Sequence, residues 1–174
     1  NIDHSPPQEQ NESANAALPN MLTLTPWILS QALGHQLIQG GQPVRGIFED
    51  SLQPLIIKRL LEPKLQRQTA GSISLGGALS LFLAAYRRAP LRIAEVGTYI
   101  GNSAASLACG AAVHQQPIHL ITCDLEPCTP DPCAGLTLPE GSKVDVIHGS
   151  STTMFEQLAA KKQTIDLLHI DGRL

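Results

Sequence analysis

Acidic, glycine and hydroxyl residues gather directly after a short apolar run. The segment 93–103 reads I-A-E-V-G-T-Y-I-G-N-S, and residues 104–113 are rich in Ala and other small residues. This order predicts a buried strand, a tight turn and the start of a helix. Gly97 and Gly101 would let the backbone approach a ligand closely, and the free N–H groups at the helix N-terminus would face it. The segment therefore predicts a site for a nucleotide-like cofactor.

Further candidate residues follow the other predicted strands. Ligands of open α/β sheets bind beyond the carboxyl ends of the strands. Asp124 follows the second predicted strand, where a carboxylate can accept hydrogen bonds from both hydroxyls of a ribose. A Gly-Ser-Ser-Thr segment, 149–152, follows the third, and Asp171 ends the fourth. We therefore expect one set of cofactor-binding residues to converge, namely Glu95, Gly97, Thr98, Tyr99, Gly101, Ser103, Asp124, Leu125, Ser151, Thr152 and Asp171.

Several of these residues have a purely structural alternative, and Gly97 and Gly101 could be simple turn glycines. Asp124 could cap a turn, and Glu95 could brace the glycine-containing loop. Ser151 or Thr152 could be the N-cap of the following helix. His169, two residues before Asp171 on the same strand, could be a base in the cleft or a hydrogen-bonded core residue.

The pattern from residue 91 onward alternates strand and helix. The predicted strands are 92–96, 118–123, 144–147 and 165–170, and the predicted helices are 102–113 and 152–161. Short apolar strands separated by crossover-length segments predict an α/β fold, a Rossmann-like doubly wound parallel sheet with helices on both faces. The proline-rich segment 126–143 predicts a loop in place of a crossover helix. The fourth strand would be an exposed apolar edge, so we expect further strands beyond it and the possibility of a homo-oligomer.

Three regions are expected along the chain. Residues 1–20 are polar and are expected to form a disordered tail. Residues 21–90 are expected to form a helical cap over the cofactor site, with one helix ending at Gly40-Gly41, one over 48–65 broken near Pro54 and Pro63, and one over 72–88. Residues 91–174 are expected to form the cofactor-binding domain, incomplete at its C-terminus.

Composition limits the classes of partner. The net charge is −3 without a long basic run, which argues against nucleic-acid binding. No apolar run approaches the roughly 18 residues of a membrane span. The first 20 residues resemble neither a signal nor a transit peptide, so we expect a cytoplasmic protein with reduced cysteines. A zinc site built from Cys123, Cys128 and Cys133, or a Cys128–Cys133 disulfide, remains an alternative.

Four segments resemble one known family. E-V-G-T-Y-I-G-N-S, 95–103, resembles motif I of class I S-adenosylmethionine-dependent methyltransferases, in the E-x-G-x-x-x-G-x-S form of the catechol and caffeoyl-CoA type of O-methyltransferase. The segments 121–126 (I-T-C-D-L-E), 148–152 (H-G-S-S-T) and 165–172 (I-D-L-L-H-I-D-G) resemble the second-strand, adenine-loop and fourth-strand motifs of that family. The four motifs occur in the family's order, and the resemblance covers residues 72–174.

The resemblance implies how S-adenosylmethionine would be held. Asp124 would bind the ribose hydroxyls, Leu125 would pack on adenine, and Ser151 and Thr152 would flank the ring. The residues that would line the methionine and its carboxylate are Gly97, Tyr99 and Ser103.

The resemblance also implies a reaction. Asp171 matches an aspartate that lies near the methyl group and binds Mg²⁺ in the metal-dependent members, which makes it the candidate catalytic residue and metal ligand. The implied activity is methyl transfer to a hydroxyl of a small-molecule acceptor. Two alternatives stay open: an NAD(P)-dependent oxidoreductase, although Tyr99 stands where G-x-G-x-x-G has its second glycine, and a non-catalytic methyltransferase-like binding domain.

Overall fold

A parallel sheet forms from the apolar segments that the sequence pattern identifies. The computed structural model describes residues 41–62, 72–126, 129 and 131–172, which all belong to one compact unit, Leu37–Leu174. Its strands are β1 (Arg92–Val96), β2 (His119–Asp124), β3 (Lys143–His148) and β4 (Leu167–Ile170). In the described part of the chain they pair in parallel in the order β3-β2-β1-β4. The chain leaves β1 toward β2 and returns on the other side of β1 as β4, so the switch point of this Rossmann-like fold lies between β1 and β4.

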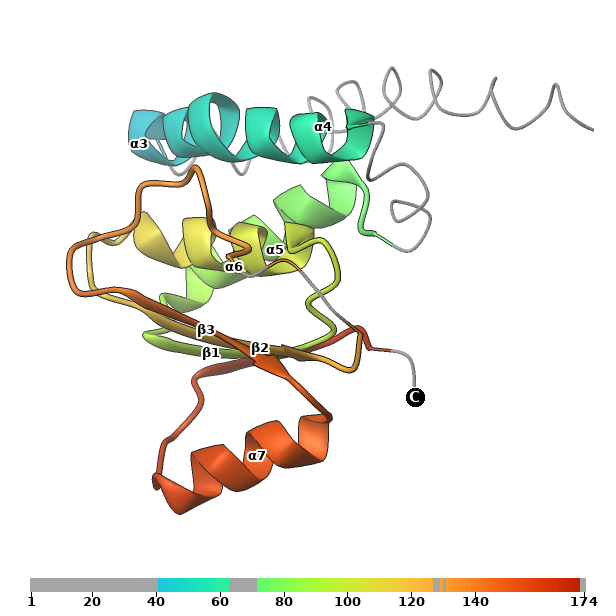
Figure 1. Cartoon of the computed structure of the whole chain (residues 1–174). Helices are drawn as coiled ribbons and strands as arrows, with labels where there is room; N and C mark the ends of the chain where they lie inside the picture. The colour runs from blue at the N-terminus through green and yellow to red at the C-terminus, as the bar shows by residue number, and fades with distance from the viewer. Residues whose placement is uncertain (1–40, 63–71, 127–128, 130, 173–174) are drawn as a thin grey trace, which may run out of the picture. The chain divides into compact units, whose positions relative to one another are not determined.

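Helices cover both faces of this sheet, as predicted. The helices α5 (Leu75–Arg88) and α6 (Asn102–Ala112) lie on one face, and α7 (Ser151–Ala160) lies on the other (Figure 1). Successive residues of a strand point to opposite faces, so Ile93 packs with the α6 residues and Ala94 with the α7 residues. The core between the sheet and α6 includes Leu107, Ala108, Ile118 and Leu120, and the core between the sheet and α7 includes Ile121, Met154 and Leu158.

The helical run before the sheet is continuous where a break was predicted. The segments α3 (Gly41–Gly46), η2 (Ile47–Leu52, a π-helix) and α4 (Gln53–Leu61) follow one another directly. The predicted break at Pro54 is wrong, because the π-helical segment shifts the hydrogen-bond register and places Pro54 in the first turn of α4, where a missing N–H is tolerated. Gly41 is the first residue of α3, and the helix predicted before it lies outside the described residues, as does Pro63.

The other boundaries differ from the predicted ones by three residues at most. The helix α5 begins after Ser74, whose hydroxyl accepts from the Gly77 N–H. β4 is shorter than predicted because Asp166 lies before it and holds the start of β1 with its side chain. The described residues of the proline-rich segment form turns and no helix, as predicted. None of the helices among the described residues has the length and apolar content to cross a membrane.

The edge strand β4 carries an exposed apolar face. Leu168 is 46% exposed and Ile170 is 61% exposed, while their neighbours on β1, Ala94 and Val96, are more deeply buried. This agrees with the expectation of an exposed apolar edge at the fourth strand.

Gly110 marks the place where α5 and α6 touch through their backbones. A Cβ at Gly110 would clash with the carbonyl oxygen of Phe82, which cannot move without shifting α5. We expect Gly110→Ala to lower the free energy of unfolding by about 2 kcal/mol, the range typical of overpacked cores. Urea titration would measure it. Gly46→Ala is the control, because a Cβ there meets no atom closer than 3.5 Å, so its stability should be unchanged or higher. Equal stability of the two variants would contradict the close contact.

Candidate functional site

The turn after β1 is held in an unusual backbone conformation. Gly97, Tyr99 and Gly101 all have positive φ angles, of 102°, 48° and 80°. Tyr99 is not a glycine, and its left-handed conformation is held by Asp124, whose Oδ2 accepts the Tyr99 N–H at 2.8 Å. Gly101 is the N-cap of α6, so this turn delivers the chain directly to the helix N-terminus. The predicted strand, glycine turn and helix are therefore present at residues 92–112.

The two glycines make room for the protein's own chain. A Cβ at Gly97 would lie 2.9 Å from the backbone of Asp171 and Gly172. A Cβ at Gly101 would lie 2.9 Å from Pro132 Cα and from Thr129 Cγ2. The sequence suggested that the glycines admit a ligand, but the structure gives a different physical reason. Gly97 lets the end of β4 approach the turn, and Gly101 lets the loop between β2 and β3 approach it.

A buried chain of hydrogen bonds lies beneath the turn. Thr122 on β2 donates to Oε2 of Glu95 at 2.6 Å, and its oxygen lies 2.6 Å from the Thr98 hydroxyl. Because Thr122 donates its only hydroxyl proton to Glu95, the Thr98 hydroxyl must donate to the Thr122 oxygen. All three side chains are almost fully buried, so Glu95 braces the turn from below, the structural alternative that the sequence left open.

Glu95 is an acid held in an unfavourable environment. Burial raises its pKa to about 7, and the charges of Asp171 and Asp124 act in the same direction. The hydroxyls of Ser103 and Thr122 oppose this shift, although Oε1 of Glu95 has no hydrogen-bond partner in the described part of the chain. The site therefore contains a buried carboxyl group whose pKa lies near physiological pH. One of its two oxygens accepts no hydrogen bond from the described residues.

The end of β2 presents a polar and an apolar side chain at the surface. Besides Tyr99, Asp124 accepts the Glu126 N–H at 3.1 Å, and its carboxylate oxygens keep lone pairs for further donors. Leu125, the next residue, is 66% exposed. The imidazole of His148 donates from Nε2 to the Leu125 carbonyl at 3.0 Å, and the Gly149 N–H donates to the Asp124 carbonyl. The ends of β2 and β3 are thus tied together next to an exposed leucine.

The helix after β3 is capped by Ser150, one residue earlier than expected. Its hydroxyl accepts the Thr153 N–H at 3.1 Å, which makes Ser150 the N-cap of α7. Ser151 and Thr152 are the first residues of the helix, so neither is its N-cap. Thr152 is exposed and Ser151 partly so.

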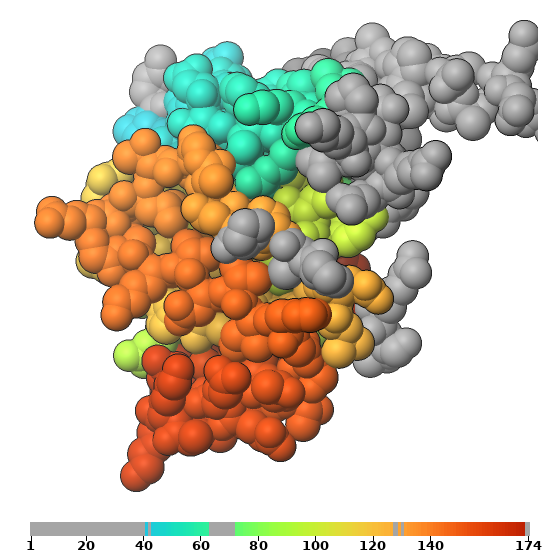
Figure 2. All heavy atoms as spheres, in the orientation of Figure 1, coloured from blue at the N-terminus to red at the C-terminus, as the bar shows by residue number. Residues whose placement is uncertain are grey.

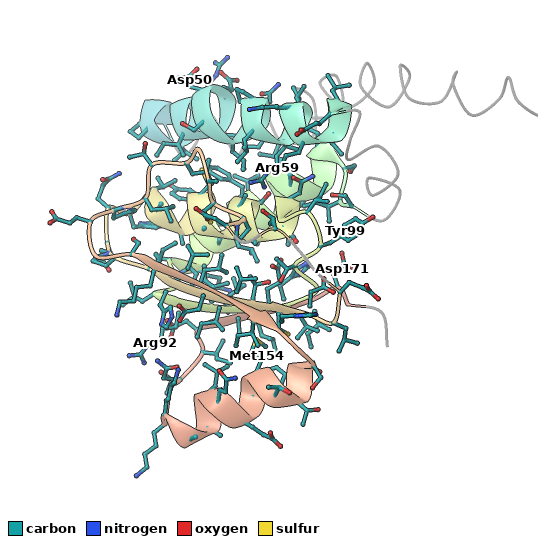
Figure 3. All side chains as sticks on the ribbon, in the orientation of Figure 1. Asp50, Arg59, Arg92, Tyr99, Met154 and Asp171 are labelled. Atoms are coloured by element: carbon teal, nitrogen blue, oxygen red, sulfur yellow. The ribbon has the colours of Figure 1, made fainter. Side chains whose placement is uncertain are left out.

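Asp171 lies beside the glycine turn. Its N–H donates to the carbonyl of Val96 at 2.9 Å, and its side chain is exposed. Figure 3 places Asp171 and Tyr99 at the same end of the sheet, opposite Arg92.

His169 pairs with Glu95 across β1 and β4. Burial lowers the pKa of His169 against the opposing charge of Asp171, and its buried Nε2 has no partner among the described residues.

A metal ligand set does not assemble around Asp171. In the described ranges no three His, Cys, Asp or Glu side chains lie close enough together to hold a metal ion. The buried thiols of Cys109 and Cys133 have pKa values raised to about 12 by burial, which disfavours the thiolate that zinc requires. Cys128 lies outside the described residues. Asp171 therefore has no set of companion metal ligands among the described residues.

Two contributors to the site escaped the sequence analysis. Thr122 reads as an ordinary β-branched strand residue, and only its place beside Glu95 in the sheet register gives it a role. Arg59 on α4 donates to the carbonyls of Gly101 and Pro132. No local sequence signal connects Arg59 with a turn more than 40 positions later.

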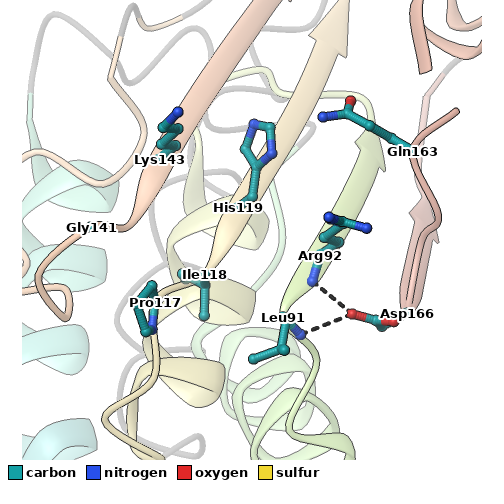
Figure 4. Close-up of a pocket in the computed structure, with 9 residues that line it drawn as sticks. All are labelled: Leu91, Arg92, Pro117, Ile118, His119, Gly141, Lys143, Gln163 and Asp166. Carbon is teal, nitrogen blue, oxygen red and sulfur yellow. Dashed lines mark hydrogen bonds between the residues drawn. The ribbon is translucent and has the colours of Figure 1, made fainter. Parts of the chain in front are cut away.

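An open cavity lies at the opposite end of the sheet, where the strands begin. It has a volume of about 450 Å³ and is lined by Leu91, Arg92, Pro117, Ile118, His119, Gly141, Lys143, Gln163 and Asp166 (Figure 4). Oδ2 of Asp166 accepts the Leu91 and Arg92 N–H groups at 3.0 and 2.8 Å. The amino ends of the strands meet here, whereas ligands of such sheets bind at the carboxyl ends, so Asp166 has a structural role at the start of β1.

Comparison with known proteins gives one match. Residues 94–174, just under half of the chain, match the family model described as a methyltransferase domain. The search of curated proteins found no match. The matched segment contains the glycine turn, Asp124, Leu125 and Asp171, and it favours neither the oxidoreductase nor the non-catalytic alternative.

Proposed function

From the match of residues 94–174 to a methyltransferase domain, we propose that this segment is a class I S-adenosylmethionine-dependent methyltransferase domain and that the protein transfers a methyl group to a hydroxyl of a small molecule. The observation that carries the proposal is the position of Asp124. Its carboxylate fixes the glycine turn through the Tyr99 N–H and still has lone pairs exposed beside Leu125. The hydroxyl as acceptor is supported by the E-x-G-x-x-x-G-x-S form of the turn, which resembles that of small-molecule O-methyltransferases.

The surface residues would contact S-adenosylmethionine, and the buried residues would hold those surface residues in position. Asp124 would accept from the ribose hydroxyls, and Leu125 would cover one face of the adenine, with Ser151 and Thr152 along its edge. Tyr99 would line the methionine part. Among the residues below the turn, the unpartnered Oε1 of Glu95 suits the positive charge of the methionine ammonium, either directly or through a bound water. The residues that would hold the turn in its binding geometry are Gly97, Thr98, Gly101 and Ser103.

The chemical step asks little of the protein beyond positioning. When bound, the sulfonium supplies an electrophilic methyl group. Asp171 is the exposed carboxylate beside the turn, and we assign it the task of orienting the acceptor hydroxyl and taking its proton at a carboxylate oxygen. His169 is a second candidate for holding this proton, because its lowered pKa keeps the imidazole neutral. No step is assigned to a metal ion.

Methyl transfer from radiolabelled S-adenosylmethionine tests this function. Phenols, catechols, aliphatic alcohols and amines would serve as acceptors, each with and without a chelator. We expect labelled product from a hydroxyl acceptor and a large loss of kcat in Asp171→Asn with little change in the affinity for S-adenosylmethionine. Labelling of amines alone would overturn the assignment to hydroxyls. Loss of activity with the chelator would show that a metal ion is needed. It would overturn the assignment of Asp171 as a base that acts without one.

Leu125 gives a separate prediction about the adenine. Leu125→Ala should weaken the binding of S-adenosylmethionine by about tenfold, since covering a leucine side chain contributes on the order of 1.5 kcal/mol. The variant should remain as stable as the wild type because Leu125 is exposed in the free protein. Leu168→Ala is the matched control, because this exposed leucine lies on the edge strand and faces the α7 side. Calorimetric Kd values that are equal for both variants would contradict the placement of adenine on Leu125.

A further inference from the structure

Arg59 joins three segments of the molecule that are distant in sequence. From α4 its Nη1 donates to the carbonyl of Gly101 at 3.1 Å, and its Nη2 donates to the carbonyl of Pro132 at 2.7 Å. The first carbonyl belongs to the glycine turn, and the second belongs to the loop between β2 and β3. Figure 3 places the Arg59 side chain between α4 and α6. One guanidinium therefore ties the helical segment, the turn and the loop together.

The loop is fitted to the turn at further points. The Thr129 N–H donates to the Tyr99 carbonyl at 3.3 Å, and the absence of a side chain at Gly101 leaves the space that Pro132 occupies. Gly135 lies against Leu55 of α4. Figure 2 shows the orange atoms of this part of the chain packed directly against the cyan helices. The loop thus lies between α4 and the glycine turn, and Arg59 spans the contact.

The chemistry of the contact makes the guanidinium hard to replace. Both acceptors are backbone carbonyls, and the planar fork of arginine can donate to two of them at fixed separation, whereas a lysine ammonium is a point charge. Arg59 is half-buried, and burial lowers its pKa against the opposing influence of Cys133 and Asp131. Two of the five N–H donors of this partly desolvated cation are bonded to these carbonyls, and the charge of Asp131 favours the cation as well.

We propose that Arg59 is a positioning residue of the cofactor site, holding the β2–β3 loop against the glycine turn so that the turn and Asp124 keep their binding geometry. This inference rests on the proposed function, because the turn and Asp124 are the residues assigned to S-adenosylmethionine. It makes α4 a functional part of the site, although α4 lies outside the matched segment 94–174.

The test compares Arg59→Met and Arg59→Lys with Arg45→Met as the matched control. Arg45 lies on the same helical run and forms an exposed ion pair with Glu49, far in sequence from the turn. Two quantities are measured on the full chain: the calorimetric Kd for S-adenosylmethionine, and amide hydrogen exchange of the ligand-free protein. We expect Kd to rise about tenfold in Arg59→Met and to be only partly restored in Arg59→Lys. Exchange should accelerate in residues 99–105 and 129–136 and stay unchanged in α7.

The outcomes separate this inference from the proposed function. If wild type binds S-adenosylmethionine and both Arg59 variants bind it equally well, Arg59 does not position the site. Uniformly faster exchange across all elements, α7 included, would reduce Arg59 to a general stabilising residue and also overturn the inference. If wild type binds no S-adenosylmethionine, the proposed function fails, while local acceleration in Arg59→Met still supports the tie between loop and turn.

Discussion

Replacing Asp124 with alanine is expected to weaken the binding of S-adenosylmethionine by at least about 100-fold. Two hydrogen bonds from ribose hydroxyls to a carboxylate would be lost, and bonds to charged groups contribute about 1.5–3 kcal/mol each. The same carboxylate holds the left-handed Tyr99 through its N–H and accepts from Glu126, so the turn loses its restraint as well. Calorimetric titration of wild type and variant would measure the difference in Kd.

Two companion variants separate the causes. Asp124→Asn keeps one carbonyl acceptor but removes the charge, so it should bind S-adenosylmethionine with an affinity between those of wild type and the alanine variant. Asp145→Ala removes an exposed acid on β3 that bonds His119 and should leave Kd unchanged. If Asp124→Ala and Asp145→Ala bind equally well, Asp124 is a turn aspartate and not a ribose ligand.

Replacing Glu95 with glutamine is expected to stabilise the protein at alkaline pH. The folded-state pKa of about 7 lies above the unfolded value of 4.5, so the folded protein holds the Glu95 proton more tightly than the unfolded chain does. Stability from this group is therefore fully present below pH 4.5 and is lost as the pH rises to about 7. The shift corresponds to a free energy on the order of 3 kcal/mol. Glutamine has no charge to bury and can still accept the Thr122 hydroxyl proton.

Urea unfolding between pH 5 and pH 8 would test this expectation. The difference in the free energy of unfolding between Glu95→Gln and wild type should grow in favour of the variant as the pH rises through that range. Glu156→Gln, the same change at an exposed acid on α7, should follow the wild-type curve. The stabilised Glu95→Gln protein should bind S-adenosylmethionine less tightly, because the unpartnered oxygen that suits an ammonium is replaced. A constant stability difference across the range would mean that Glu95 does not titrate there.

Features that depend on short stretches of sequence were predictable. The strand 92–96 has the predicted bounds, because an apolar run followed by a glycine turn leaves little choice of register. The alternating pattern after residue 91 predicted the parallel sheet with helices on both faces. The N-cap of α7 was less determined, because the three consecutive hydroxyl residues Ser150, Ser151 and Thr152 can all cap a helix, and packing selects the first.

Features that depend on distant contacts were not predictable. Nothing near Arg59 indicates that its guanidinium reaches Gly101 and Pro132, since their positions follow only from how α4, the turn and the loop pack. The pattern of glycines at 97 and 101 was found correctly, but its physical reason was not. Only the fold reveals that the backbone of Asp171 and the side chain of Pro132 occupy the space beside them.

Binding of the methyl donor to the wild-type protein is the most direct test of the central claim. The purified chain would be titrated by calorimetry with S-adenosylmethionine and, separately, with NAD⁺. The arrangement of Asp124, Leu125 and the glycine turn predicts micromolar binding of S-adenosylmethionine and none of NAD⁺. Binding of NAD⁺ alone, or of neither compound, would contradict the proposal that the methyl donor binds at the carboxyl ends of the strands.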